Sequence, residues 1–318
     1  MKILIIRLSS LGDIILTQPL CALLHKHYPE AELHYLCKPE YAALVACFGL
    51  PINTIEYSKS LSWHLSLIRL RYDLVLDLHG KFNSYLAANL VRAKQKSLYD
   101  KKRNLRKAIV SHKTSTAIDS TVSLYCTALK KLGIRDAWDN PALIPTRQQK
   151  PKTQGQAPKI ACFPGATHYT KRWPIEYWRA LIASMPECSF TLLGGGGDKV
   201  LAKGICANGT VNCSDQTAKF NLSELVDELQ DYDIVLSGDT GPMHMAAALA
   251  LPQIALFGGT HPRLGFKPLN PKAQILSADL DCQPCSLHGL KACPQGHFKC
   301  MQSLSPQILS RQIEELLS

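Results

Sequence analysis

The chain has 318 residues, of which 46% are hydrophobic and 19% are charged. These proportions exclude a disordered chain, and the length is enough for two domains of about 150 residues each. Basic residues outnumber acidic ones by 36 to 25, which gives a formal net charge of +11. A charge of this sign favours an anionic partner such as nucleic acid, an anionic membrane surface or an acidic substrate.

The apolar stretches of the sequence are short. The run at 1–7 lacks the length and the cleavage site of a signal peptide. The longest stretch, 243–259, is interrupted by His244 and Pro252 and falls short of the ~20 residues that cross a bilayer. We therefore expect a cytoplasmic protein without a membrane span.

The first half of the chain alternates predicted strands and helices. Residues 2–8 form a continuous apolar run, which is typical of a strand buried on both faces. A helical stretch follows to about residue 28, and Pro19 should restart it. Further strands are expected at 32–36, 54–57 and 74–78, with helices at 41–48 and 61–70. Such alternation predicts a parallel sheet with right-handed crossovers.

The alternation stops at 141–158, which contains four prolines and almost no apolar residues, a composition typical of a linker. It then restarts, with strands expected at 159–163, 190–193, 234–236 and 253–257 and with helices at 175–184 and 223–230. The predicted fold class is therefore α/β, with doubly wound, Rossmann-like parallel-sheet domains at 1–150 and 151–318 and an interdomain cleft as the ligand site. The last helix can also pack back onto the first domain in this interpretation, and a single larger sheet is the alternative.

The most informative segment is Ser237-Gly238-Asp239-Thr240-Gly241-Pro242-Met243-His244. It follows the predicted strand at 234–236 and opens into an alanine-rich helix, whose first turn suits Pro242. A helix N-terminus has unpaired N–H groups and a partial positive charge, so it binds phosphate readily. Thr240 and His244 can contribute to such a site, whereas Asp239 needs another partner. An ordinary capped crossover helix is the alternative.

Three further loops follow predicted strands. Asp13, in Ser9-Ser10-Leu11-Gly12-Asp13, is either a helix cap or a general base. In the loop at 163–174, Thr167 and Lys171 can reach a phosphate. The segment Gly194-Gly195-Gly196-Gly197-Asp198 fails the dinucleotide fingerprint, yet Asp198 can bind sugar hydroxyls. A flexible turn is the alternative there.

Two clusters stand apart from these loops. Nine basic residues and one acid lie at 92–113, either as a solvated loop or as a site for an anionic partner. Cys282, Cys285, Cys293 and Cys300 have spacings that suit zinc. Reduced packing thiols and an oxidisable pair are the alternatives.

Three of these segments stand in an order and at separations that resemble the ADP-heptose:lipopolysaccharide heptosyltransferases. They are Ser9-Ser10-Leu11-Gly12-Asp13, Lys171-Arg172-Trp173-Pro174 and Gly238-Asp239-Thr240-Gly241-Pro242-Met243-His244. The resemblance covers essentially the whole chain. The tail from Cys282 to Met301 resembles the type II enzymes, which add the second heptose.

The resemblance implies a GT-B architecture and an inverting, metal-independent transfer that uses no cofactor. The donor would be ADP-L-glycero-D-manno-heptose, and the acceptor would be Kdo or the first heptose of the lipopolysaccharide inner core. It further implies a cytoplasmic enzyme that is peripheral to the inner membrane and binds no nucleic acid.

Site roles follow from the same resemblance. Asp13 matches the catalytic base. The donor-binding residues would be Thr167, Lys171, Asp198, Asp239, Thr240, Gly241 and His244. Ala166 stands where some members carry a hydroxyl. The basic segment at 92–113 would face the anionic acceptor, and the candidate acceptor contacts are Arg7, Ser10, Lys101, Lys102, Arg103 and Arg106.

Three other functions remain open from the sequence. The first is a related transferase that uses another nucleotide-sugar. The second is a nucleotide-sugar sensor without catalysis, which would bind ADP without needing Asp13. The third is a basic nucleic-acid-binding protein, although the sequence carries no recognition motif of that class.

Overall fold

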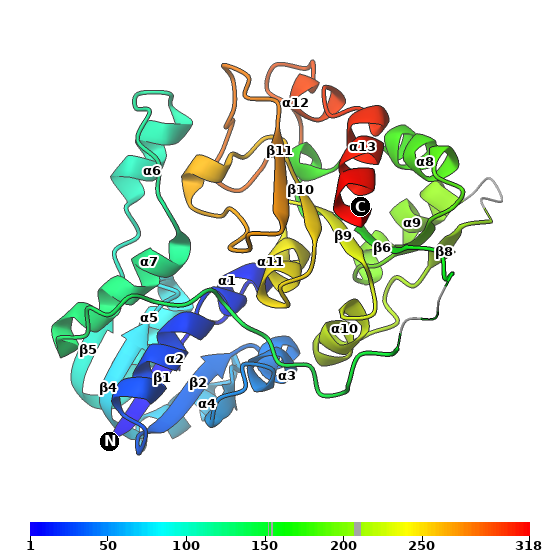
Figure 1. Cartoon of the computed structure of the whole chain (residues 1–318). Coiled ribbons are helices and arrows are strands. Elements are labelled where there is room, and N and C mark those ends of the chain that lie inside the picture. Colours follow the sequence, from blue (N-terminus) through cyan, green and yellow to red (C-terminus); the bar gives the residue numbers. More distant parts are fainter. Residues whose placement is uncertain (152, 154, 207–210) are drawn as a thin grey trace. The chain divides into compact units, whose positions relative to one another are not determined.

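The structure is a computed structural model that describes residues 1–151, 153, 155–206 and 211–318. The chain forms two compact units (Figure 1). The first unit contains residues 1–102 and 120–144, and the second contains residues 103–119 and 145–318. Each unit is built around one parallel sheet with helices packed against it.

The first unit has a five-stranded sheet in the order β3-β2-β1-β4-β5, and every pairing in it is parallel. Its strands are β1 (Lys2–Ile6), β2 (Glu32–Cys37), β3 (Ile52–Glu56), β4 (Arg71–Asp77) and β5 (Arg92–Leu98). Its helices are α1 (Leu11–Ile15), α2 (Gln18–His27), α3 (Ala42–Ala46), α4 (Leu61–Leu67), α5 (Phe82–Leu90) and α7 (Thr121–Cys126), with the 3₁₀ helices η1 (Pro39–Tyr41) and η2 (Thr127–Leu132).

The second unit has a six-stranded parallel sheet in the order β11-β10-β9-β6-β7-β8. Its strands are β6 (Lys159–Phe163), β7 (Ser189–Leu192), β8 (Cys213–Asp215), β9 (Ile234–Gly238), β10 (Gln253–Phe257) and β11 (Ala273–Ser277). Its helices are α6 (Arg103–Val110), α8 (Ile175–Ser184), α9 (Lys199–Cys206), α10 (Leu222–Leu229), α11 (Gly241–Ala248), α12 (Lys299–Gln302) and α13 (Pro306–Leu317), with the 3₁₀ helices η3 (Tyr169–Lys171), η4 (Gly196–Asp198) and η5 (Pro262–Leu264).

Both sheets change winding direction next to their first strand. In the first unit the chain winds outward from β1 through β2 to β3, and then returns to add β4 and β5 on the other side of β1. In the second unit β6 and β9 have the same relationship. In sheets of this topology the carboxyl ends of two such strands border a crevice, because the loops that follow them turn to opposite faces of the sheet. The loops after β1 and β4, and those after β6 and β9, are therefore the expected ligand-binding positions.

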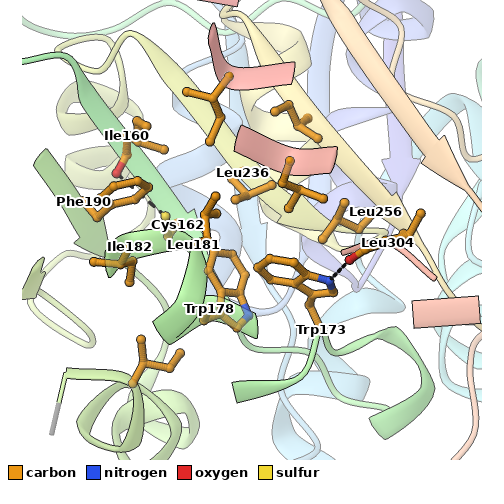
Figure 2. Close-up of a cluster of buried hydrophobic side chains, with 14 of the residues drawn as sticks. Ile160, Cys162, Trp173, Trp178, Leu181, Ile182, Phe190, Leu236, Leu256 and Leu304 are labelled. Carbon is orange, nitrogen blue, oxygen red and sulfur yellow. Dashed lines mark hydrogen bonds between the residues drawn. The ribbon is translucent and has the colours of Figure 1, made fainter. Parts of the chain in front are cut away.

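The central strands of the second sheet are buried on both faces, as their continuous apolar runs predict. Figure 2 shows Trp173 and Trp178 at the centre of the core on one side of this sheet. Their rings meet edge to face at 5.1 Å, and the Trp173 indole N–H donates to the Leu304 carbonyl at 2.7 Å. This core holds the loop that follows β6 against the body of the unit.

The structure confirms the predicted α/β class and the restart of the helix at Pro19, which lies in the first turn of α2. The described part of 141–158 contains no helix or strand.

Three of the strands in the structure were not predicted from the sequence. Within 92–113, residues 92–98 form the edge strand β5, where Lys94 pairs with Asp73 at 2.7 Å. Edge strands tolerate charged residues because one side of them faces solvent. The short β8 and the outer β11 are the other two.

The compact units differ from the predicted domains at 1–150 and 151–318 in where residues 103–119 and 145–150 belong. Residues 103–119 group with the second unit, because Arg106 stacks on Phe266 at 4.8 Å and the Ile118 N–H donates to the Arg263 carbonyl. The last helix, α13, packs on α8 within the second unit (Figure 1). Its buried residues, Leu309 and Ile313, belong to the core that contains the two tryptophans.

Candidate active site

Asp13 lies at the crevice of the first sheet, in the first turn of α1. Its carboxylate has three partners. Arg7 approaches it to 2.6 Å, the Ser10 hydroxyl donates to it at 2.9 Å, and the Tyr125 hydroxyl donates to it at 3.0 Å. The capping interpretation and the catalytic one are therefore both structurally possible, because a carboxylate that caps a helix can still have an accessible oxygen. The Asp13 side chain remains 22% exposed.

Arg7 fixes the charge of Asp13. The guanidinium is 8% exposed and also donates to the backbone carbonyls of Ser9 and Leu78. Burial by itself would raise the pKa of Asp13, but the Arg7 charge and the hydrogen bonds from Ser10 and Tyr125 outweigh it and lower this pKa to about 2. Asp13 is consequently ionised at all physiological pH values. It can accept a proton only from a group that becomes acidic during a reaction.

The loop after β4 supplies the other side of this crevice, and sequence reasoning missed it. His79 is 7% exposed, and no described residue hydrogen-bonds to its Nδ1. Burial, followed by the charge of Arg7, lowers the pKa of His79 to about 4. The residue is therefore a neutral imidazole near Asp13. Its position one residue beyond the predicted strand at 74–78 was the available signal.

Lys101 reaches this loop from the basic segment. Its ammonium group donates to the carbonyls of His79 and Gly80 at 2.7 and 2.8 Å. Gly80 has a φ of +57°, and a Cβ on it would lie 2.8 Å from the Lys101 side chain. Glycine is therefore needed there both for the backbone conformation and for the approach of the lysine.

The other predicted acceptor residues differ in what their side chains do. Lys102 is exposed and pairs with Asp100 at 2.9 Å, and Arg103 is exposed at the start of α6. Arg106 is buried against Phe266, so packing accounts for its position. Lys102 lies in the first unit, whereas Arg103 and Arg106 lie in the second.

In the second unit, Lys171 and Asp239 meet at the crevice between β6 and β9. The Lys171 Nζ lies 2.9 Å from the Asp239 carboxylate, and the Thr260 hydroxyl donates to the same carboxylate oxygen at 2.7 Å. The side chain of Asp239 is 8% exposed and that of Lys171 is 15% exposed. Asp239, the one anionic side chain of the segment at 237–244, therefore has Lys171 as its partner and holds the lysine in place.

Close backbone packing brings Lys171 to this place. A Cβ on Gly238, at the end of β9, would lie 2.7 Å from the Lys171 carbonyl oxygen. A Cβ on Gly258, after β10, would lie 2.4 Å from the Thr170 carbonyl oxygen. The Gly259 N–H donates to that carbonyl at 2.8 Å. Only glycine allows the segment that ends in Lys171 to lie directly on the ends of these strands.

Helix α11 starts beside this ion pair. Thr240 is its extended N-cap residue, and Pro242 lies in its first turn, where the missing N–H costs no hydrogen bond. The Thr240 hydroxyl donates to the Gly238 carbonyl at 3.3 Å and does not cap the helix. His244 is 5% exposed, one turn into the helix. The partial positive charge of the helix start and the Lys171 ammonium together suit a diphosphate.

The remaining predicted donor residues lie on the adjoining loops. Thr167 is exposed in the loop after β6. The Asp198 carboxylate accepts the Gly195 N–H at 2.9 Å and lies against Gly165, where an added Cβ would be 2.0 Å from it. Asp198 therefore joins the loop after β7 to the loop after β6. The loops after three neighbouring strands, β7, β6 and β9, and the first turn of α11 contain all of the predicted donor residues: Thr167, Lys171, Asp198, Asp239, Thr240, Gly241 and His244.

The four clustered cysteines lie outside this group. Burial and the neighbouring thiols raise the pKa of Cys285, and they raise that of Cys300 to about 11. No two cysteines of the described residues form a disulfide. No group of three or more His, Cys, Asp or Glu side chains is placed to hold a metal ion in the part of the chain that the structure describes.

Two Rossmann-like units, each with one parallel sheet and helices packed against it, are the architecture of the GT-B class of glycosyltransferases. Residues 61–292 match the profile of glycosyltransferase family 9 (heptosyltransferase). This match covers more than half of the chain, and the protein therefore belongs to that family and is a heptosyltransferase.

Several heptosyltransferases are similar to this chain along its whole length. The chain is 24% identical to lipooligosaccharide heptosyltransferase 2 of Campylobacter jejuni and 26% identical to lipopolysaccharide heptosyltransferase 1 of Pseudomonas aeruginosa, with 100% of this chain and 98% of each relative covered. A solved structure of Escherichia coli ADP-heptose lipopolysaccharide heptosyltransferase II superposes with a TM-score of 0.77 at 20% identity, over 100% of this chain and 98% of that one. The family prediction and the GT-B fold are confirmed. Relatives numbered 1 and 2 match comparably, so the type II assignment stays a prediction.

Proposed function

We propose that this heptosyltransferase transfers L-glycero-D-manno-heptose from its ADP derivative to the inner core of a lipopolysaccharide precursor. The names of the relatives support the class of donor and acceptor. The observation that carries the donor assignment is the Lys171–Asp239 pair beside the start of α11, at the crevice of the second sheet. This arrangement suits a sugar diphosphate, because it combines a held ammonium group with unpaired helix N–H groups.

The proposed reaction is a single inverting displacement. The acceptor hydroxyl oxygen forms a bond to the anomeric carbon while the bond from that carbon to the diphosphate oxygen breaks, and ADP leaves with both electrons. The hydroxyl proton passes to the Asp13 carboxylate and then to solvent. Arg7 and Tyr125 hold Asp13 in place, so their role is to position the base.

The low pKa of Asp13 is compatible with this role. A carboxylate with a pKa of about 2 does not deprotonate an ordinary alcohol. The hydroxyl becomes strongly acidic once its oxygen has begun to bond to carbon, and Asp13 then accepts the proton. The ion pair with Arg7 makes Asp13 a weaker base, but it also keeps the carboxylate fully ionised.

Charge on the leaving diphosphate would be stabilised by Lys171, the Thr240 hydroxyl and the N–H groups of α11. Each such preorganised donor contributes about 3 kcal/mol when it faces the developing charge. Thr167 would add a hydroxyl contact, and Asp198 would bind sugar hydroxyls. These groups would perform the function that a divalent cation performs in other glycosyltransferases, so the proposed transfer is metal-independent and uses no cofactor.

On the acceptor side, the anionic inner core would contact Lys101, Lys102, Arg103, Arg7 and Ser10. Lys101 and Arg7 belong to the crevice that contains Asp13. Arg106 is buried, so it would not contact the acceptor itself. Transfer to a lipid-anchored acceptor implies that the enzyme works at the inner face of a membrane. Among the described residues, the structure contains no helix with the length and apolar character of a membrane span.

A panel of ADP-, UDP- and GDP-sugars tests the donor, first by thermal shift and then by turnover with Kdo-containing acceptors. We expect stabilisation by ADP and by ADP-heptose, and release of ADP only when an acceptor is present. Turnover that persists in the presence of a strong chelator would support metal independence. Stabilisation by UDP-sugars alone would overturn the donor assignment in favour of a related transferase.

A further inference from the structure

Large apolar side chains gather on the solvent-facing sides of α4 and α5. Leu61 is 75% exposed, Phe82 is 79% exposed and Tyr85 is 61% exposed. Of the fifteen large apolar side chains that are exposed in the described part of the chain, six lie within residues 61–86. These six define the α4–α5 apolar face: Leu61, Leu65, Ile68, Phe82, Tyr85 and Leu86.

Helix periodicity places these residues on one surface. Leu61, Leu65 and Ile68 are spaced by four and three residues, as are Phe82, Leu86 and the adjoining Asn89, so each set forms one stripe along its helix. The two helices pack against each other. Their opposite sides, represented by Leu67 and Ala87, are buried in one core of the first sheet. The apolar face is therefore additional to the face that folding requires.

The charges around this face have one sign. The sequence contains no acidic residue at 57–72 or at 78–99. Lys59, Arg69, Arg71 and Lys81 are exposed in or next to the two helices. Two acids lie between these segments: Asp73 is paired with Lys94 at 2.7 Å, and Asp77 is buried. An exposed apolar patch of several side chains marks an interaction site, and the basic border indicates an anionic partner.

Leucine and aromatic side chains bordered by lysine and arginine have the composition of a surface that lies in the interface of an anionic bilayer. The centre of a protein–protein interface is, by contrast, depleted of lysine. We propose that the α4–α5 apolar face inserts into the headgroup region of an anionic membrane, with the four basic residues contacting lipid phosphates. The inference rests on the proposed function only in that a lipid-anchored acceptor requires the enzyme to work at a membrane.

Co-sedimentation of the full chain with vesicles tests this surface. Vesicles of phosphatidylcholine with phosphatidylglycerol are compared with phosphatidylcholine alone. We expect binding to the anionic vesicles that weakens with added salt. The double variant F82S/Y85S should reduce the partition coefficient by about tenfold or more, because two apolar side chains lose their burial in lipid. L61S/L65S should have a similar effect, and K81Q/R69Q a smaller one that is confined to anionic vesicles.

The matched control is V200S/I308S, which removes two exposed apolar residues of the second unit, 86% and 39% exposed, and should bind like the wild type. Thermal unfolding checks that each variant is folded, and the two independent pairs on α4 and α5 keep the test decisive if one of them is unstable. Wild-type binding that is absent, or that all the variants retain, would overturn the inference. So would a homodimer that F82S/Y85S dissociates, since the face would then be an interface between two copies.

Turnover separates this inference from the proposed function. With a delipidated, soluble acceptor, F82S/Y85S should show the kcat and KM of the wild type. If the wild type binds anionic vesicles through this face but transfers no heptose to any inner-core acceptor, the proposed function fails and the membrane surface stands. If transfer occurs and vesicle binding does not, the reverse holds.

Discussion

The crevices of the two sheets have the same topology but present opposite charges. In the first unit the buried partner is the cation: Arg7 is 8% exposed and the Asp13 that it holds is 22% exposed. In the second unit the buried partner is the anion: Asp239 is 8% exposed and Lys171 is 15% exposed. Each crevice thus directs one charged group outward and uses the opposite charge to fix it. One fold can therefore supply a base for one substrate and a cation for another, depending on which partner is buried.

Removing the Asp13 carboxylate tests the role of the first unit. D13A and D13N should lower kcat by about 10³-fold, because general-base catalysis typically contributes 10²–10⁴-fold. The affinity for ADP should change little, since the donor groups lie in the other unit. Steady-state ADP release gives kcat, and calorimetry with ADP gives the affinity. Y125F, which removes only one hydrogen bond to Asp13, is the matched control and should lose less than about tenfold. Near-normal turnover by D13N would contradict the assignment.

Removing the ammonium group of Lys171 tests the role of the second unit. K171M should lower kcat by about 10²-fold and weaken ADP binding, because a group that stabilises the leaving diphosphate also binds the product. D239N should lower both to a smaller extent, since it leaves the ammonium in place without its anchor. Comparing K171M, D239N and the double variant in a cycle measures their coupling. Strictly additive effects would show that the ion pair does not position the lysine.

A third experiment concerns the pH dependence that Arg7 imposes. In the wild type the carboxylate of Asp13 has a pKa of about 2, below its ordinary value of about 3.9. The stability that this gives is present above about pH 4 and is lost as the pH falls toward 2. In R7Q, burial is no longer opposed by the guanidinium, so the acidic limb of kcat/KM should move up to pH 4 or above. An acidic limb that is identical in R7Q and in the wild type would contradict this account.

Elements that are marked by residues close together in the sequence could be predicted, whereas contacts between distant residues could not. The strands β1 and β9 could be predicted, because a continuous apolar run followed by helix-start residues is visible within a short stretch of sequence. The strand β5 could not, because its alternating lysines resemble a solvated loop until β4 pairs with it. The role of Asp239 was also not readable. Its partners, Lys171 and Thr260, are far apart in the sequence, and only the close packing at Gly238 and Gly258 brings the lysine to it.

The smallest expected effect concerns His79, the site residue that sequence reasoning missed. Its pKa of about 4 means that the imidazole stays neutral from pH 8 to about pH 5, whereas a solvent-exposed histidine titrates near 6.5. Side-chain nitrogen shifts in ¹⁵N-labelled protein measure this directly. Because a neutral imidazole can exchange hydrogen bonds with an acceptor sugar, H79A should raise the acceptor KM several-fold and leave ADP affinity unchanged. H64A, on α4, is the matched control. A His79 that titrates near 6.5 would show that its ring is solvated and that Arg7 does not act on it.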